Sequence, residues 1–273
     1  MRVGTTAALA VAALLAVGVG AGYAQRIFAG GYGSTPPRFP NANSFQGTFT
    51  FCRAMFTSDR REKRGWSTDF PGADINFSIR LAELTRTHVA QQATGTDPEY
   101  VVVRLTDQNL FKCPYLLMED AGTIALSNQE VTAFRDYLLK GGFAFVSDTW
   151  GAFAREQFAD EIGRVLPPST YPLIELTIDH PIWRSQFRMT EVPQMPSIQA
   201  WRRTGGATDR GVSDPVDPLG IADDHGRLMV VWIHNSDVPD GWEREGEDPQ
   251  YFYRFSPHAY ATGINVFLYA ATH

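Results

Sequence analysis

The sequence predicts an α/β protein: a three-layer sandwich around a mostly parallel, doubly wound sheet of the flavodoxin-like kind. Apolar strand-like runs alternate with helical patterns along the chain, and such crossovers are right-handed and leave neighbouring strands parallel. The runs at 143–146 and 228–233 are almost continuously apolar, as in strands buried on both faces. The helix signal between 127 and 141 is the clearest of the chain.

The first half of the domain supplies three predicted strands and one helix. The strands are the apolar, β-prone runs at 48–55, 100–105 and 115–118. In residues 73–86, Ile75, Ile79 and Ala82 recur on one face at helical spacing, which predicts a helix packed on the sheet.

The next segment has explicit start and stop signals. Ser127 and Glu130 form a capping box, in which each side chain bonds an orphan amide of the first turn. Gly141 follows the periodic residues and favours the left-handed stop of a helix. A strand is therefore expected at 143–147, directly after this helix.

The second half continues the alternation less regularly. We expect a helix at 152–165, strands at 173–178 and 228–233, and a last helix that begins with Ser256 as N-cap and Pro257 in its first turn. Residues 189–226 are rich in Pro and Gly, and they are interpreted as a long excursion with a short helix near 197–202.

The amino-terminal residues 1–24 are predicted to be a secretory signal peptide. The apolar run 7–19 is shorter than the about 20 residues that span a bilayer, and it ends at the small-x-small site Gly22-Tyr23-Ala24. The alternative is an uncleaved anchor, since no charge lies between Arg2 and Arg26. We expect an exported protein, periplasmic or extracellular, with no stable membrane insertion after cleavage.

The mature chain divides into a flexible linker at 25–44 and one α/β domain at 45–273. The linker prediction follows from its Gly, Pro and Asn content. The net charge of −6 argues against nucleic acid as a partner, because phosphate binding needs an excess of basic residues. Cys52 and Cys113 are the two cysteines; export permits a disulfide, and two buried thiols are the alternative.

Acidic and aromatic residues follow several predicted strands. They are Trp66 and Asp69, then Asp148 and Trp150, then Asp179 with His180, and finally Asn235, Asp237 and Trp242. In a parallel sheet ligands bind beyond the carboxyl ends of the strands, so these segments are expected to meet at one edge. Each also has a simpler role as a helix cap, a turn former or a packing residue.

Several motifs in this pattern resemble one family. They are the segments 65–76, 126–130, 138–143, 148–151, 180–182, 220–228, 235–237, 241–243 and 263–265. Together they are similar to the family called domain of unknown function 4159, over about 45–273. The resemblance implies a class I glutamine-amidotransferase-like, flavodoxin-type fold in an exported or membrane-linked protein without an agreed activity.

This chain departs from the pattern of the related proteins at two positions that concern metal binding and catalysis. The family often carries two consecutive acids where this chain has Asp148-Thr149, which weakens a metal site built on that pair. Neither cysteine lies in the Gly-x-Cys-x-Gly turn of an amidotransferase nucleophile, so glutaminase activity is not expected. Serine-hydrolase elbow, zinc HExxH, phosphate-loop and dinucleotide motifs are also missing, and neither a cofactor nor a metal is predicted.

Two functions remain as hypotheses. The first is a non-catalytic envelope domain that binds glycan or a partner protein through Trp66, Asp69, Asp148, Trp150, Asn235, Asp237 and Trp242. The second is a hydrolase, acting on glycans for example, in which Asp148 works with Asp69 or His180. Carboxylates on one edge could equally hold a divalent cation, although no spacing signature indicates one.

Overall fold

The computed structural model describes residues 35–273 except 60–64, 94 and 212–213. The predicted signal peptide and residues 25–34 of the predicted linker therefore lie outside the described residues. In the part of the chain that is described, none of the helices combines the length and the apolar character needed to cross a bilayer.

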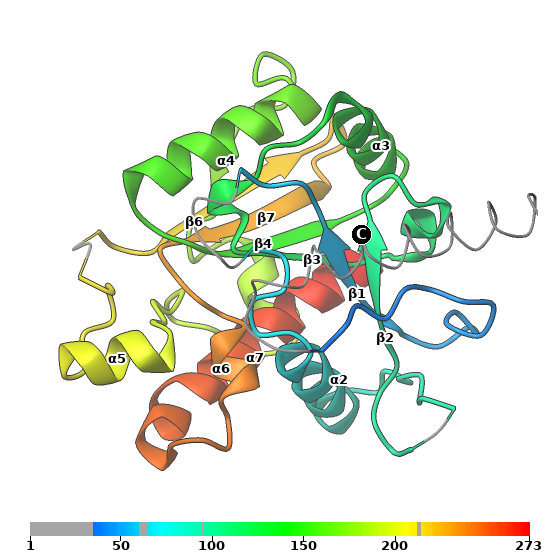
Figure 1. Ribbon diagram of the computed structural model, residues 1–273. Helices are drawn as coiled ribbons and strands as arrows, with labels where there is room; N and C mark the ends of the chain where they lie inside the picture. The colour runs from blue at the N-terminus through cyan, green and yellow to red at the C-terminus, as the bar shows by residue number, and fades with distance from the viewer. Residues whose placement is uncertain (1–34, 60–64, 94, 212–213) are drawn as a thin grey trace, which may run out of the picture.

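The centre of the molecule is a seven-stranded mixed sheet with the order β2-β1-β3-β4-β7-β6-β5 (Figure 1). The strands are β1 (Phe51–Met55), β2 (Tyr100–Arg104), β3 (Leu116–Glu119), β4 (Ala144–Thr149), β5 (Ile174–Glu175), β6 (Asp217–Ala222) and β7 (Leu228–His234). The first five in this order are parallel, whereas β6 and β5 are antiparallel additions. The parallel part has the flavodoxin-like order, whose switch point lies between β1 and β3.

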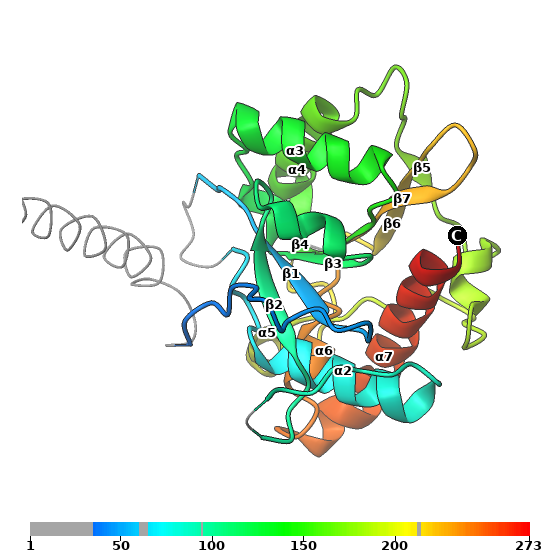
Figure 2. The same ribbon diagram turned by 90° about the vertical axis from the view of Figure 1, so that its right-hand side faces the viewer.

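Helices cover both faces of the sheet, as the predicted three-layer sandwich requires (Figure 2). The α-helices are α2 (Gly72–Leu84), α3 (Asn128–Leu139), α4 (Gly151–Val165), α5 (Ile198–Thr204), α6 (Asp240–Glu243) and α7 (Pro249–Thr272). The short 3₁₀ helices are η1 (Gln108–Lys112), η2 (Ala121–Thr123) and η3 (Pro181–Arg184). Helices α3 and α4 lie on one face, and α2, α6 and α7 lie on the other.

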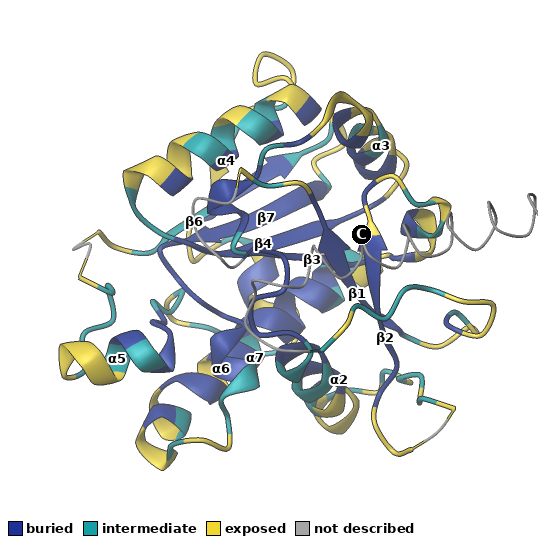
Figure 3. Cartoon of the chain, viewed as in Figure 1, coloured by how far each residue is buried: buried dark blue, intermediate teal, exposed yellow. Residues whose placement is uncertain are grey.

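The strands form the core because both of their faces are covered. Strands β1, β3, β4 and β7 are buried along their whole length (Figure 3). This explains their nearly continuous apolar sequences. The capping box of Ser127 and Glu130 is present at the start of α3, as predicted.

The carboxy-terminal half differs from the prediction in three respects. The segment 189–226 contains the strand β6, which pairs antiparallel with β7. Strand β5 is limited to two residues rather than the expected 173–178. The last helix begins at Pro249, with Asp248 as its N-cap, so that Pro257 lies inside it. The start signal missed in the sequence was Asp248-Pro249, which satisfies the same capping rule as the predicted start at Ser256-Pro257.

A disulfide joins Cys52 to Cys113, so the alternative of two buried thiols is wrong. Cys52 lies in β1 and Cys113 lies just before β3, at a sequence separation of 61. The bond therefore ties together the two strands that flank the switch point.

The described end of the predicted linker packs along the outer strand β2. The carbonyl oxygen of Arg38 accepts a hydrogen bond from the amide of Val102, at 2.9 Å. The Arg38 guanidinium donates to Gln92 and makes an ion pair with Glu99. This segment therefore covers part of the open edge of the sheet.

Candidate functional site

Polar residues in left-handed backbone conformations mark the carboxyl edge of the parallel strands. Asp69, Asp120, Asp148 and Asn235 have φ values of 57°, 47°, 55° and 58°. Only Asn and Asp among larger residues adopt this region readily, and such residues often cluster at functional sites. They follow or end β1, β3, β4 and β7, which are neighbours in the sheet.

A fully buried arginine organises the switch point. Arg53, in β1, bonds Asp74 of α2 through Nε and Nη2, and its Nη1 contacts Glu119 at 2.6 Å. The same Nη1 lies within bonding distance of the carbonyl oxygens of Trp66 and Thr68. Arg53 thus fixes the loop that carries Asp69, and it holds Glu119 at the end of β3.

Three carboxyl groups meet beside this arginine. Asp69, Glu119 and Asp237 each offer an oxygen, and these atoms all lie within 4.8 Å of one another. Burial raises the pKa of all three groups well above the usual range, and repulsion between the carboxylates raises it further. Strongly shifted carboxyl groups at the switch point of an open sheet indicate a functional site.

Asp69 also approaches a second pair of acids, Asp240 and Glu243 of α6. These acids already have protein partners. Asp240 Oδ2 accepts hydrogen bonds from the Ile198 amide at 2.8 Å and from the Tyr251 hydroxyl at 2.9 Å. Arg244 pairs with Glu243 at 2.6 Å. Burial raises the pKa of Asp240 to about 7.

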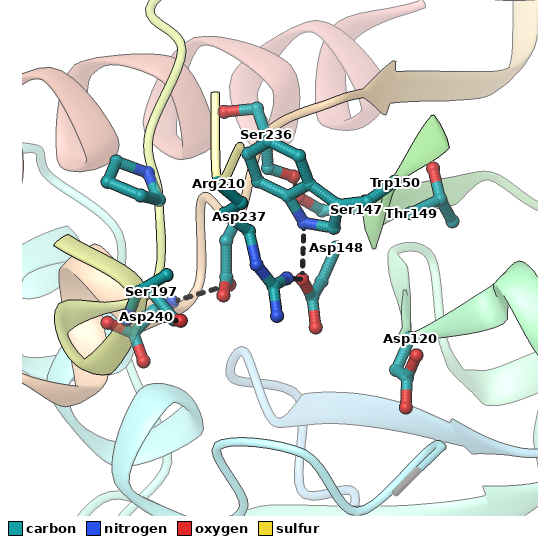
Figure 4. Close-up of polar contacts among 12 residues, drawn as sticks. Asp120, Ser147, Asp148, Thr149, Trp150, Ser197, Arg210, Ser236, Asp237 and Asp240 are labelled. Carbon is teal, nitrogen blue, oxygen red and sulfur yellow. Dashed lines mark hydrogen bonds and ion pairs between the residues drawn. The ribbon is translucent and has the colours of Figure 1, made fainter. Parts of the chain in front are cut away.

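The third part of the site is built around Asp148. Its Oδ1 accepts hydrogen bonds from Trp150 Nε1 and from Arg210 Nη1, both at 2.8 Å. The Arg210 guanidinium lies over the Trp150 ring, 4.9 Å from its centroid. Figure 4 shows this guanidinium between the carboxyl groups of Asp148 and Asp237. No donor in the described part of the chain bonds Oδ2 of Asp148.

The expected helix-cap roles of Asp69 and Asp148 are not observed. Helix α2 has Pro71 as its N-cap and α4 has Trp150, and neither end has a side-chain cap bond. Instead, Asn235 Oδ1 accepts a hydrogen bond from the Gly151 amide at the start of α4, and its Nδ2 donates to the Pro215 carbonyl. Asn235 is therefore structural, and it frees Asp148 from capping.

Two of the predicted ligand-binding tryptophans are core residues. Trp66 is 1% exposed and packs against Phe70. Trp242 is fully buried, with its ring 4.5 Å from that of Phe77. A Cβ at Gly263 would lie 2.3 Å from the Trp242 ring, so only glycine fits beneath it. Neither ring is available to stack on a ligand, whereas Trp150 lies at the site and is partly exposed.

His180 lies apart from the acidic residues. After the short β5 the chain turns back, and the His180 ring lies 6.0 Å from that of Tyr269 on the face covered by α7. The Tyr269 hydroxyl accepts a hydrogen bond from the amide of Leu228, the first residue of β7. The expectation that all four segments meet at the carboxyl edge is therefore wrong for 179–181, because the turn at 177–180 brings His180 to the amino end of β7.

Several residues of the site were missed in the sequence. They are Arg53, Glu119, Arg210 and Asp240. A charged residue inside the predicted strand at 48–55, and another directly after the one at 115–118, were a usable signal for Arg53 and Glu119, because an ionised group at a two-sided strand needs a buried partner. Arg210 lies in the irregular excursion, where no periodic pattern locates a side chain.

Comparison with known proteins agrees with this architecture. No curated protein matches the chain. A family profile described as "Domain of unknown function (DUF4159)" matches residues 58–271, which include every strand except β1 and all the site residues named above except Arg53. The chain belongs to this family of domains of unknown function, DUF4159.

Proposed function

We propose that the protein is a hydrolase whose reaction takes place at Asp148, at the carboxyl edge of the sheet. The proposal rests on the environment of the Asp148 carboxylate. It is held at a left-handed turn by two hydrogen bonds to a single oxygen, and its second oxygen is left for a water molecule or substrate. A fixed carboxylate of this kind suits a general base.

In the proposed reaction Asp148 accepts a proton from a water molecule. The water oxygen then bonds to the electrophilic atom of the substrate, the bond to the leaving oxygen breaks, and the proton passes from Asp148 to that oxygen. Arg210 stands beside the base and can hold a negatively polarised oxygen of the substrate, as a guanidinium does at such sites.

Binding without turnover is the second candidate function. In the sequence, three tryptophans beside acids favour a glycan-binding surface. Trp66 and Trp242 are in the core, so Trp150 alone is left for stacking, and Arg210 covers its ring. The burial of these rings favours the hydrolase over a stacking platform, while Trp150 and Asp148 remain suited to a polar ligand.

We further propose that the protein acts after export, in the periplasm or outside the cell, on a substrate available there, such as a glycan. The Cys52–Cys113 disulfide supports an oxidising compartment, and residues 1–24 have the pattern of a cleaved signal. The flavodoxin-like strand order also supports the amidotransferase-like fold that the motifs implied.

The test is a turnover screen of the purified protein against chromogenic glycosides, carboxylic esters and phosphate esters, and against isolated envelope glycan. The wild-type protein should cleave one class, and Asp148→Asn should lower kcat at least about 100-fold, the scale expected for a lost general base. Asp217→Asn, which removes a partly exposed acid paired with Arg155, should retain full activity.

Equal turnover by the wild-type protein and Asp148→Asn would refute the proposed role of Asp148. A compound that binds to the wild-type protein in calorimetry, and is recovered intact after prolonged incubation, would instead support the binding-only candidate.

A further inference from the structure

The acids at the switch point differ from Asp148 in one respect: their oxygens that lack a donor are buried away from solvent. Glu119 is fully buried and Asp69 is 7% exposed. Among the described residues, no N–H, hydroxyl or guanidinium group donates to Asp69 Oδ2 or to Glu119 Oε1. The two carboxyl groups can bond each other only when one of them holds a proton. Buried polar atoms are nearly always satisfied, so two such oxygens at one point require an explanation.

The charges around these acids also call for a ligand that satisfies the buried oxygens. Arg53 lies next to Glu119, but its remaining donors are used by Asp74 and by main-chain carbonyl groups. Arg210 bonds Asp148, and Arg244 pairs with Glu243. Asp69 and Asp237 have no ion pair within the described residues. Buried acids without a counter-charge hold protons instead of charge, and a cation among them would take the place of those protons.

We propose that Asp69, Glu119 and Asp237 bind a hard divalent cation, such as Mg²⁺, Mn²⁺ or Ca²⁺. All the ligand atoms are carboxylate oxygens, which such cations prefer, and no His or Cys belongs to the group. Their spacing of up to 4.8 Å fits a shared ion, because oxygens on opposite sides of these cations lie about 4–5 Å apart.

The neighbouring group of Asp69, Asp240 and Glu243 is the weaker candidate. Asp240 is bonded by an amide and a hydroxyl, and Glu243 by Arg244, so both would have to leave partners to bind an ion. The three acids at the switch point also come from the ends of three strand-borne segments, after β1, β3 and β7, which the sheet holds in place. The proposed cation site does not depend on hydrolysis at Asp148.

The experiment is isothermal titration calorimetry on the purified chain, stripped with EDTA and dialysed, with MgCl₂, MnCl₂ and CaCl₂ in separate titrations. We expect one ion per chain for at least one cation, with a matching rise in Tm, because a ligand that binds the folded state stabilises it. Asp69→Asn and Asp237→Asn should each weaken the affinity at least about tenfold.

Two variants serve as matched controls. Glu243→Gln removes an acid of the second group, and Asp148→Asn removes the proposed base; both should bind the ion within about threefold of wild type. Far- and near-ultraviolet circular dichroism verifies that every variant is folded. If a variant fails to fold, the wild-type stoichiometry and Tm shift still decide the question.

Absence of heat and of a Tm shift with all three cations at millimolar concentration would overturn the cation site. Retained affinity in both Asp69→Asn and Asp237→Asn would overturn these ligands. Ion binding that survives in Asp148→Asn, with loss of turnover, supports both proposals separately. Turnover without ion binding in the wild-type protein overturns the cation site alone, and ion binding without turnover in the wild-type protein overturns the hydrolase alone.

Discussion

Arg210 donates a hydrogen bond to Asp148 at 2.8 Å from a loop that is 62 residues away in sequence, and it covers Trp150 at the same time. The pair joins the irregular excursion to the central strand β4. Arg210 is itself in a left-handed conformation, with a φ of 53°. The conformation of this loop thus places the Arg210 guanidinium beside Asp148 and Trp150.

We predict that Arg210→Met lowers kcat/KM by about 10- to 100-fold on the substrate found in the screen, because the base loses a positioning partner and its counter-charge. Arg210→Lys should restore part of the loss, since it keeps the charge without the planar contact with Trp150. Steady-state kinetics measures both. Unchanged kinetics in Arg210→Met would mean that the pair serves only the structure.

Arg53 should contribute far more than Arg210 to the free energy of unfolding. In Arg53→Met, Asp74 and Glu119 remain buried without their cation, and we expect a loss of about 3–5 kcal/mol in the free energy of unfolding. Arg155→Met is the matched control, because it removes a more exposed ion pair with Asp217 and should cost about 1 kcal/mol or less. Urea unfolding of both variants tests this, and equal losses would contradict the prediction.

The disulfide closes a loop of 61 residues, so its loss should cost about 4 kcal/mol through the entropy of the unfolded chain. The measurement is urea unfolding of Cys52→Ala/Cys113→Ala against the wild-type protein. Reductant should destabilise the wild-type protein and leave the double variant unaffected. A double variant as stable as the oxidised protein would show that the bond contributes nothing to folding.

His234 should make stability depend on pH. Burial lowers its pKa to about 4, whereas an unfolded histidine has a pKa near 6.5. Between these values the unfolded chain takes up a proton that the folded chain does not, so this group lowers the stability as the pH falls from about 6.5 to 4, by about 3 kcal/mol in total. Above pH 6.5 its contribution is constant.

Buried acids with raised pKa values act in the opposite direction, so the test compares variants. His234→Gln should lose this part of the pH dependence, as measured by urea unfolding between pH 7 and 4. His225→Gln, at an exposed position, should keep the wild-type dependence. Identical pH curves for His234→Gln and the wild-type protein would contradict the assignment.

Local signals were sufficient to predict most of the parallel core. The capping box at Ser127 and the apolar run of β7 act through neighbouring residues alone, so a single sequence reveals them. Strand β6 escaped because its pairing with β7 is not encoded by its own mixed sequence, Asp217–Ala222. The start of α7 was misplaced because Asp248-Pro249 and Ser256-Pro257 are equally good start signals.

The site was predictable only in part. Asp69, Asp148 and Asp237 lie where the ends of parallel strands should bring them together. Glu119 and Arg53 were hidden within strands, and the burial of Trp66 and Trp242 depends on packing between distant elements. Asp240 reaches the site through α6, a four-residue helix too short for any periodic pattern.

The Arg38 segment has one more consequence, for self-association. An outer parallel strand such as β2 exposes unpaired amides that a second copy of the chain could extend into a shared sheet. Here one of those amides, that of Val102, is already bonded to the Arg38 carbonyl. The segment around Arg38 therefore protects this edge of the sheet from pairing with a second copy of the chain. Chains shortened past Arg38 should form oligomers as their concentration rises.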